Sequence, residues 1–184
     1  AVWKDLFHDA ALLLLALGEA ENEGRISNNA SGVFASLFAV GPGPVASTEA
    51  SAKERLPILT DAISSASSER RRLAIAACTV MLESRHWTRM AGPENQGLRR
   101  GANLWVPKTY AEWYDAYRQA WQMLREATDK LLEDESSLAL DALLGRVRGL
   151  TTVPDLAEMV IDTIRDLATK PYVDKKKVLG HVVQ

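Results

Sequence analysis

The stretch Lys53–Leu82, KERLPILTDAISSASSERRRLAIAACTVML, contains two apolar helical patterns separated by a polar turn. Its first half places Leu56, Leu59 and Ile63 at intervals of three and four residues, which predicts a helix although Pro57 lies inside it. The second half carries a stripe at i, i+3, i+4, i+7 and i+8: Leu73, Ala76, Ala77, Val80 and Met81. Serines before Glu69 can cap this second helix. The stretch therefore predicts a helix pair.

This pair resembles a HEAT-type repeat. Such repeats carry a proline in the first helix, a short polar turn, and a basic residue near the start of the second helix. Pro57 and Arg71 hold these positions, and small residues follow at Ala74, Ala76 and Ala77. The aspartate usual in the turn is missing, with Ser65 or a neighbour in its place, so the partner of Arg71 stays open. The resemblance covers one repeat and implies packing of helix pairs, without implying any chemistry.

The rest of the chain continues the helical pattern. A helix with apolar residues from Trp3 to Leu17 is expected to be buried nearly all round. Further helices are indicated by apolar spacing after these start signals: Asn28 or Asn29, the Thr109–Glu112 capping box, Thr152 with Pro154, and Asp174. Another helix runs through 140–147, with Gly149 as its expected end. No segment alternates with a period of two, so we predict an all-α fold of about six to eight helices in HEAT-like pairs, without a sheet.

Composition limits the classes of function. The chain has 184 residues, of which 47% are apolar and 25% charged, as in folded globular domains. Its formal net charge of −2 does not favour nucleic acid or an anionic membrane as the main partner. The single cysteine, Cys78, excludes an internal disulfide and a thiolate metal cluster, and it fits a cytoplasmic location. The longest apolar run, 10–17, is too short to span a bilayer.

The domain organisation follows from the same patterns. We expect a single helical domain over 1–184, interrupted by a long loop at 84–108, because loops of this length are uncommon and often functional. The chain begins at Ala1 without a methionine and ends within an amphipathic pattern. We therefore expect it to be a fragment of a larger polypeptide.

A polar corner, GEAENEGRISNNASGVF at 18–34, lies between two apolar runs. Its polar residues that we regard as candidates for interaction are Glu19, Glu21, Asn22, Glu23, Asn28 and Asn29. Glu19 and Glu23 would share a helix face and could serve a metal-assisted hydrolase. No histidine has a metal-ligand spacing to them, so we favour capping of the next helix by Asn28 or Asn29. Any further role would be recognition of a neighbouring domain.

Two basic clusters and two tryptophans are the remaining candidates. Arg70–Arg72 and Arg99–Arg100 could contact phosphates, which keeps nucleic-acid binding open as an alternative. Arg71 already has a structural explanation in the repeat resemblance. Trp87 and Trp105 lie in the long loop, where an exposed aromatic residue would suit a protein interface.

Two segments, ALGEAENEGRISNNASGVFASLF at 16–38 and GPENQGLRRGANLWVPKTYAEW at 92–113, resemble the helical region of bacterial STAND-type NTPase proteins, several of which act in phage defence. The resemblance implies a sensor or signalling arm that follows a nucleotide-binding module. The sequence itself has no GxxxxGK[ST] motif, since GPGPVAST at 41–48 lacks the lysine. We therefore expect a non-catalytic helical scaffold of a larger cytosolic protein, without a cofactor, whose partner is the rest of its own chain or another protein.

Overall fold

The computed structural model describes residues 1–22, 29–40, 48–84 and 100–183. These described residues form eight α-helices and no strand, which confirms the predicted all-α class. The helices are α1 (Lys4–Glu19), α2 (Ala30–Ser36), α3 (Ala52–Ile63), α4 (Ser68–Met81), α5 (Tyr110–Lys130), α6 (Glu133–Thr151), α7 (Pro154–Thr169) and α8 (Lys175–Val183).

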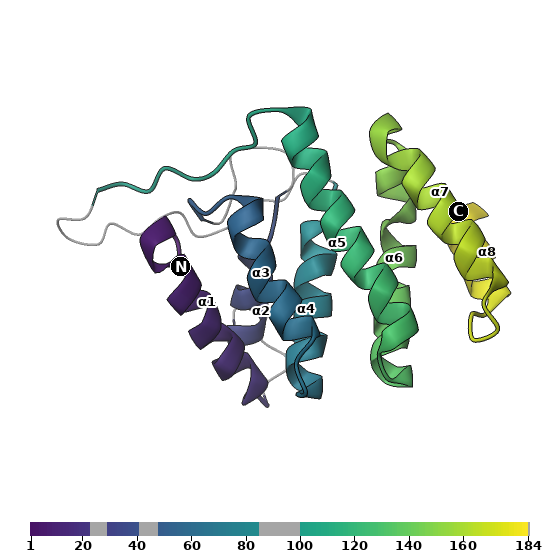
Figure 1. Cartoon of the computed structure of the whole chain (residues 1–184), viewed down its shortest axis with the longest axis horizontal. Coiled ribbons are helices and arrows are strands. Elements are labelled where there is room, and N and C mark those ends of the chain that lie inside the picture. The colour runs from purple at the N-terminus through teal and green to yellow at the C-terminus, as the bar shows by residue number, and fades with distance from the viewer. Residues whose placement is uncertain (23–28, 41–47, 85–99, 184) are drawn as a thin grey trace.

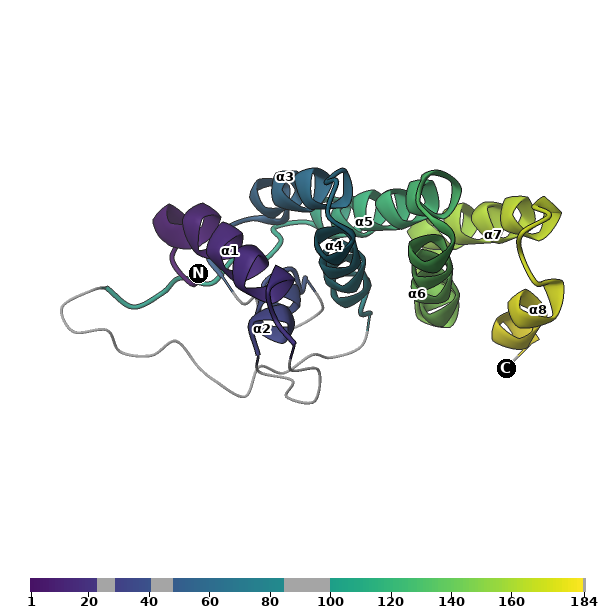
Figure 2. The ribbon, with the colours of Figure 1, turned by 90° about the horizontal axis from the view of Figure 1, so that it is seen from below.

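The helices are arranged as a stack of consecutive pairs in two layers. Figure 2 shows α1, α3, α5 and α7 in one layer and the even-numbered helices in the other. Within each layer every helix contacts the next one along, from α1 to α3, α5 and α7, and from α2 to α4, α6 and α8. The α1/α2 pair lies at one end of the stack and the α7/α8 pair at the other (Figure 1).

Side-chain caps mark several of the helix starts that the sequence predicts, but not the start of α7, where Val153 precedes the helix. Asn29 and Ser67 accept hydrogen bonds from the Gly32 and Arg70 amides at the starts of α2 and α4. Thr109 caps α5, but the Glu112 carboxylate accepts a bond from the Lys108 amide rather than from the Thr109 amide. The expected helix end at Gly149 is wrong, because α6 continues to Thr151.

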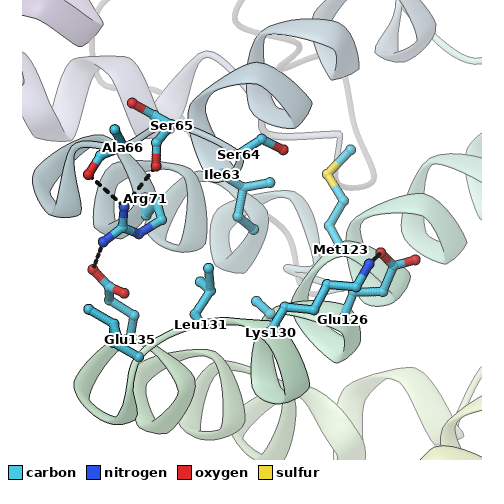
Figure 3. Close-up of a pocket in the computed structure, with 12 residues that line it drawn as sticks. Ile63, Ser64, Ser65, Ala66, Arg71, Met123, Glu126, Lys130, Leu131 and Glu135 are labelled. Atoms are coloured by element: carbon cyan, nitrogen blue, oxygen red, sulfur yellow. Dashed lines mark hydrogen bonds and ion pairs between the residues drawn. The ribbon is translucent and has the colours of Figure 1, made fainter.

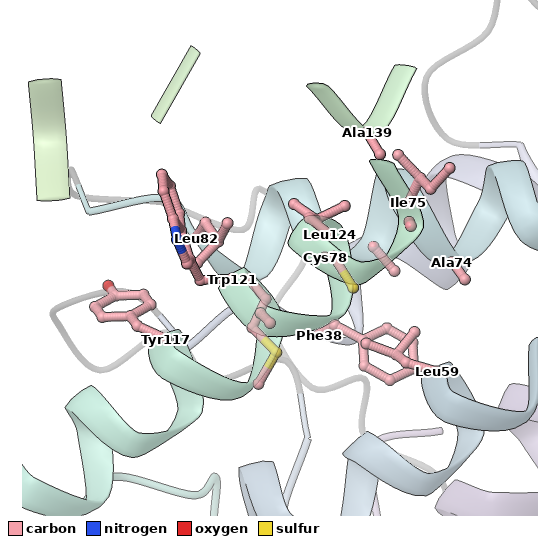
Figure 4. Close-up of a cluster of buried hydrophobic side chains, with 14 of the residues drawn as sticks. Phe38, Leu59, Ala74, Ile75, Cys78, Leu82, Tyr117, Trp121, Leu124 and Ala139 are labelled. Carbon is pink, nitrogen blue, oxygen red and sulfur yellow. The ribbon is translucent and has the colours of Figure 1, made fainter. Parts of the chain in front are cut away.

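Helix α4 occupies the middle of the stack and contacts α1, α2, α3, α5 and α6. Figure 4 shows its side chains among those of α3, α5 and α6. Leu73, Ala77 and Met81 of the predicted stripe are buried, but Ala76 is exposed and Val80 is half-buried. The buried face instead extends to Ala74, Ile75 and Cys78. The predicted stripe is too narrow because α4 has neighbours on several sides rather than on one.

Helix α1 buries a stripe made of Phe7, Ala11, Leu15 and Gly18. The expectation that it is buried nearly all round is wrong, because Leu6, Leu13 and Leu17 are 37%, 61% and 52% exposed. Since α1 belongs to the terminal pair, one of its sides has no neighbouring helix among the described residues.

Candidate functional site

The polar corner after α1 is a capping structure in its described part. The Glu21 carboxylate accepts bonds from the Ala30 amide at 3.1 Å, the Ser31 amide at 3.0 Å and the Ser31 hydroxyl at 2.6 Å. These bonds, led by the one from the Ser31 side chain, lower the pKa of Glu21. A carboxylate at a helix N-terminus satisfies backbone N–H groups that have no partner within the helix. Glu21 therefore stabilises the start of α2 together with Asn29.

Glu19 faces α4 rather than the Glu21 cluster. Its Oε2 lies 2.7 Å from Arg70 Nε, and hydrogen bonds from Ser67 and then Arg70 lower the pKa of Glu19. Asn22 is exposed, whereas Glu23 and Asn28 lie outside the described residues. The structure therefore gives Glu19 and Glu21 separate structural partners. Within the described ranges, no three His, Cys, Asp or Glu side chains are grouped so that they could hold a metal ion.

The arginines of the two basic clusters are paired with carboxylates. Arg70 pairs with Glu19, Arg71 with Glu135, Arg72 with Asp134, and Arg100 with Glu49. Arg99 lies outside the part of the chain that the structure describes. Phosphate binding depends on cations whose charge is available to the ligand. Each described arginine in these clusters is already partly neutralised by an acid.

The described end of the long loop is fixed to the α1 and α3 side of the stack. Arg100 binds the Glu49 carboxylate through both terminal nitrogens, at 2.5 Å and 2.8 Å, and this pair lowers the pKa of Glu49 to about 2. The Trp105 amide donates to the Thr48 carbonyl at 3.0 Å, and its ring lies 5.2 Å from the Arg55 guanidinium. Trp105 is half-buried, and Trp87 lies outside the described residues. The contacts of Arg100 and Trp105 are thus within the chain.

A groove that the sequence did not indicate lies between two successive helix pairs. It has a volume of about 580 Å³ and runs between the α3–α4 turn and the α5–α6 turn (Figure 3). Its apolar part is formed by Ile63, Met123, Ala127 and Leu131. Its polar rim is formed by Ser64, Ser65, Glu126 and Lys130, with Glu126 and Lys130 paired at 2.6 Å.

One wall of the groove is the ion pair between Arg71 and Glu135. Arg71 Nη2 lies 2.8 Å from Glu135 Oε1, and Arg71 Nη1 donates to the Ser65 and Ala66 carbonyls at 2.7 and 2.9 Å. Arg71 thus bonds two carbonyls of its own turn and a glutamate of the next helix pair. The Arg71 guanidinium, ahead of a weaker contribution from the Ser68 hydroxyl, lowers the pKa of Glu135.

The same wall contains two polar atoms without a well-aligned hydrogen-bond partner, Arg71 Nε and Glu135 Oε2. The Glu135 side chain is 2% exposed and that of Arg71 is 12% exposed. Buried donors and acceptors normally find a partner, because an unmade bond costs about 1–3 kcal/mol. The groove therefore has an apolar floor, and its wall contains one donor and one acceptor that lack a partner and are covered by neighbouring atoms. The only hint of it in the sequence is the turn that lacks a partner for Arg71.

A comparison of the chain with protein-family models, with curated proteins and with solved structures found no match in any of the three. Among the described helices, none is both long enough and apolar enough to cross a membrane.

Proposed function

We propose that this chain is a non-catalytic helical scaffold that binds a protein segment, as part of a larger cytosolic protein. The observation that carries the proposal is the groove beside Arg71 and Glu135. Stacked helix pairs form extended surfaces along their length, and the grooves between successive pairs recur as binding surfaces in such arrays. The ion pair between Arg71 and a later helix pair also supports the HEAT-like relationship.

The groove is best suited to an extended peptide. An aliphatic side chain would pack on Ile63, Met123 and Leu131, because these residues supply the apolar floor. A peptide bond offers one N–H and one C=O, which match the unused acceptor on Glu135 and the unused donor on Arg71. Both atoms are covered by neighbouring atoms, so we expect the Arg71 and Glu135 side chains to shift together when the peptide binds.

The role within a larger protein is also part of the proposal. The resemblance of 16–38 and 92–113 to STAND-type NTPases favours a sensor or signalling arm, whose groove would receive a segment of another domain or of a partner. This role would require neither a metal nor a nucleotide in the helical array itself.

The proposal is tested by selecting peptides from a random library displayed on phage, with the 184-residue chain as bait. We expect enrichment of peptides that carry a central aliphatic residue. Ala66→Trp should abolish their binding, because Ala66 is an exposed residue that lines the groove.

The matched control is Ala76→Trp, which adds the same side chain at an exposed position of α4 outside the groove lining. It should bind the selected peptides like the wild type. Failure to enrich any peptide, or equal loss of binding in both variants, would reject the groove as the binding surface.

A further inference from the structure

The outward side of α1 carries an apolar seam made of Leu6, Ala10, Leu13 and Leu17. These residues are spaced by four, three and four positions, which is the a/d spacing of a heptad repeat. The three leucines are 37%, 61% and 52% exposed, so this seam is not part of the domain core. Spacing of this kind specifically suits another helix lying alongside, rather than a sheet or a loop.

Contacts on the other side of α1 establish which way the seam points. Lys4 pairs with Glu54 of α3, and Glu19 pairs with Arg70 of α4. Gly18 lies against Leu73 of α4, where an added Cβ would be 3.1 Å from a Leu73 methyl group. At 3.6 residues per turn, the seam is centred about 150° around the helix from Lys4 and Glu19 and about 110° from Gly18, so it lies on a different side of the helix from these three contacts. Its leucines are exposed, and α1 lies at one end of the stack (Figures 1 and 2).

Stacked helical arrays normally end in a polar outer face, because an apolar end invites further packing. We infer that this face of α1 is a self-association surface, on which α1 of a second copy packs antiparallel across a two-fold axis. This inference does not depend on the proposed peptide groove, which lies between α3/α4 and α5/α6.

The side chains of the seam are complementary to themselves in the antiparallel arrangement. The seam is symmetric about its centre, so Leu6 would lie opposite Leu17 of the second copy, and Ala10 opposite Leu13. A large residue then meets a small one at both central positions, which fills space evenly. A parallel arrangement in register would place Ala10 against Ala10 and leave a gap there.

Charge favours the same direction. Helix α1 has three acidic residues: Glu19 pairs with Arg70 of α4, and the other two, Asp5 and Asp9, are both in the first half of the helix. A two-fold axis places these residues at opposite ends of the dimer, whereas parallel packing would gather them at one end, where like charges repel. The helix dipoles also oppose one another favourably in the antiparallel pair.

The seam covers only two heptads of a single helix. A surface of this length is small beside a standard protein interface, which buries roughly 800 Å² on each partner. We therefore expect a weak, reversible dimer whose population depends on protein concentration. Sedimentation velocity of the 184-residue chain, from about 10 µM to about 1 mM, should show a mass that rises from one chain toward two.

Two exposed leucines of α1 provide a matched pair of variants. Leu13→Glu lies in the seam and should keep the chain monomeric over the whole range. Leu12→Glu, at a residue 43% exposed on another side of the helix, should dimerise like the wild type. Circular dichroism should give the same helix content for both variants, since neither leucine belongs to the core.

A second measurement tests whether the two α1 helices run antiparallel. A mixture of Leu6→Cys and Leu17→Cys chains should form the mixed disulfide in preference to either symmetric one.

The inference is overturned if the wild type stays monomeric throughout, which would leave the seam to a helix of a different protein. It is equally overturned if Leu13→Glu still dimerises or if Leu12→Glu loses the dimer to the same extent. Dominance of the two symmetric disulfides over the mixed one would reject the antiparallel arrangement.

Discussion

Arg71 of α4 and Glu135 of α6 are 64 residues apart in the chain, yet their side chains meet at 2.8 Å and join two successive helix pairs. Arg71 also holds the carbonyls of Ser65 and Ala66 in its own turn. One guanidinium thus connects the end of α3, the start of α4 and the start of α6. The stack depends on this connection at the point where the groove opens.

Replacing Arg71 should therefore cost more than removing a surface ion pair. Arg71→Met leaves the Glu135 carboxylate buried, with only the Ser68 hydroxyl as a bonded side chain, at 2.6 Å. We expect the free energy of unfolding to fall by about 2–4 kcal/mol, because an uncompensated buried charge is costly. Urea unfolding followed by circular dichroism measures this change.

The double variant Arg71→Met/Glu135→Leu distinguishes a loss of charge pairing from a loss of packing. With both charges removed, no buried ion remains without a partner, and much of the stability should return. If the double variant is less stable than the wild type by the sum of the losses in the two single variants, the two residues act independently and the pairing argument fails.

The repeat resemblance suggested a structural role for Arg71 and left its partner open. Local spacing identifies a basic residue at the start of a second helix, whereas Glu135 becomes its neighbour only through the stacking of two pairs. The groove was missed for the same reason, because its residues come from four helices and two turns. Apolar spacing locates helices well, but it does not reveal which side of a helix will have a neighbour.

Helix α1 illustrates that limit. Leucines occupy four consecutive positions, 12–15, so apolar residues occur on every side of the helix and periodicity cannot select the buried one. Phe7, Ala11 and Leu15 are buried because α2 and α4 lie on their side. The polar corner was predicted more successfully, since Asn29 caps α2 as its position before the apolar run indicated. The contribution of Glu21 to the same cap requires the chain to fold back, which no local pattern encodes.

Cys78 should be unreactive in the folded protein. Its thiol is fully buried in the centre of the stack, and burial raises its pKa to about 12, so the reactive thiolate is scarce at neutral pH. We expect no reaction with an aromatic disulfide reagent in native buffer and complete reaction after unfolding in guanidinium chloride. Ala76→Cys, on an exposed position of the same helix, should add one fast-reacting thiol. Fast labelling of the native wild type would contradict the burial of Cys78.

Two glycines within helices should respond differently to alanine. Gly145 in α6 has open space where a Cβ would be added, so Gly145→Ala should stabilise the fold by about 0.5–1 kcal/mol through helix propensity. At Gly18 the added Cβ would lie 3.1 Å from Leu73 and 3.2 Å from the Ser31 hydroxyl. That crowding should cancel or reverse the gain. Thermal unfolding of both variants tests the close approach of α1 to α4, which would be refuted by an equal gain at the two positions.

The stability of the fold should fall in acid, in part through Glu49. This carboxylate is 6% exposed and accepts bonds from both terminal nitrogens of Arg100 and from the Asn103 and Lys4 amides. The bond from Arg100 is the largest cause that lowers the pKa of Glu49 from 4.5 to about 2. Because the folded pKa lies below the unfolded one, the contribution of Glu49 is present above pH 4.5 and is lost as the pH falls toward 2.

Glu49→Gln removes the titrating group and weakens the contact with Arg100. We expect this variant to be less stable than the wild type at pH 7, with a difference that shrinks steadily between pH 4.5 and 2. Urea unfolding at intervals across this range gives the two stability curves. Glu158→Gln, at an exposed position of α7, is the matched control and should follow the wild-type curve. A constant difference between Glu49→Gln and the wild type at every pH would mean that Glu49 acts through packing, and that its ionisation contributes nothing to the fold.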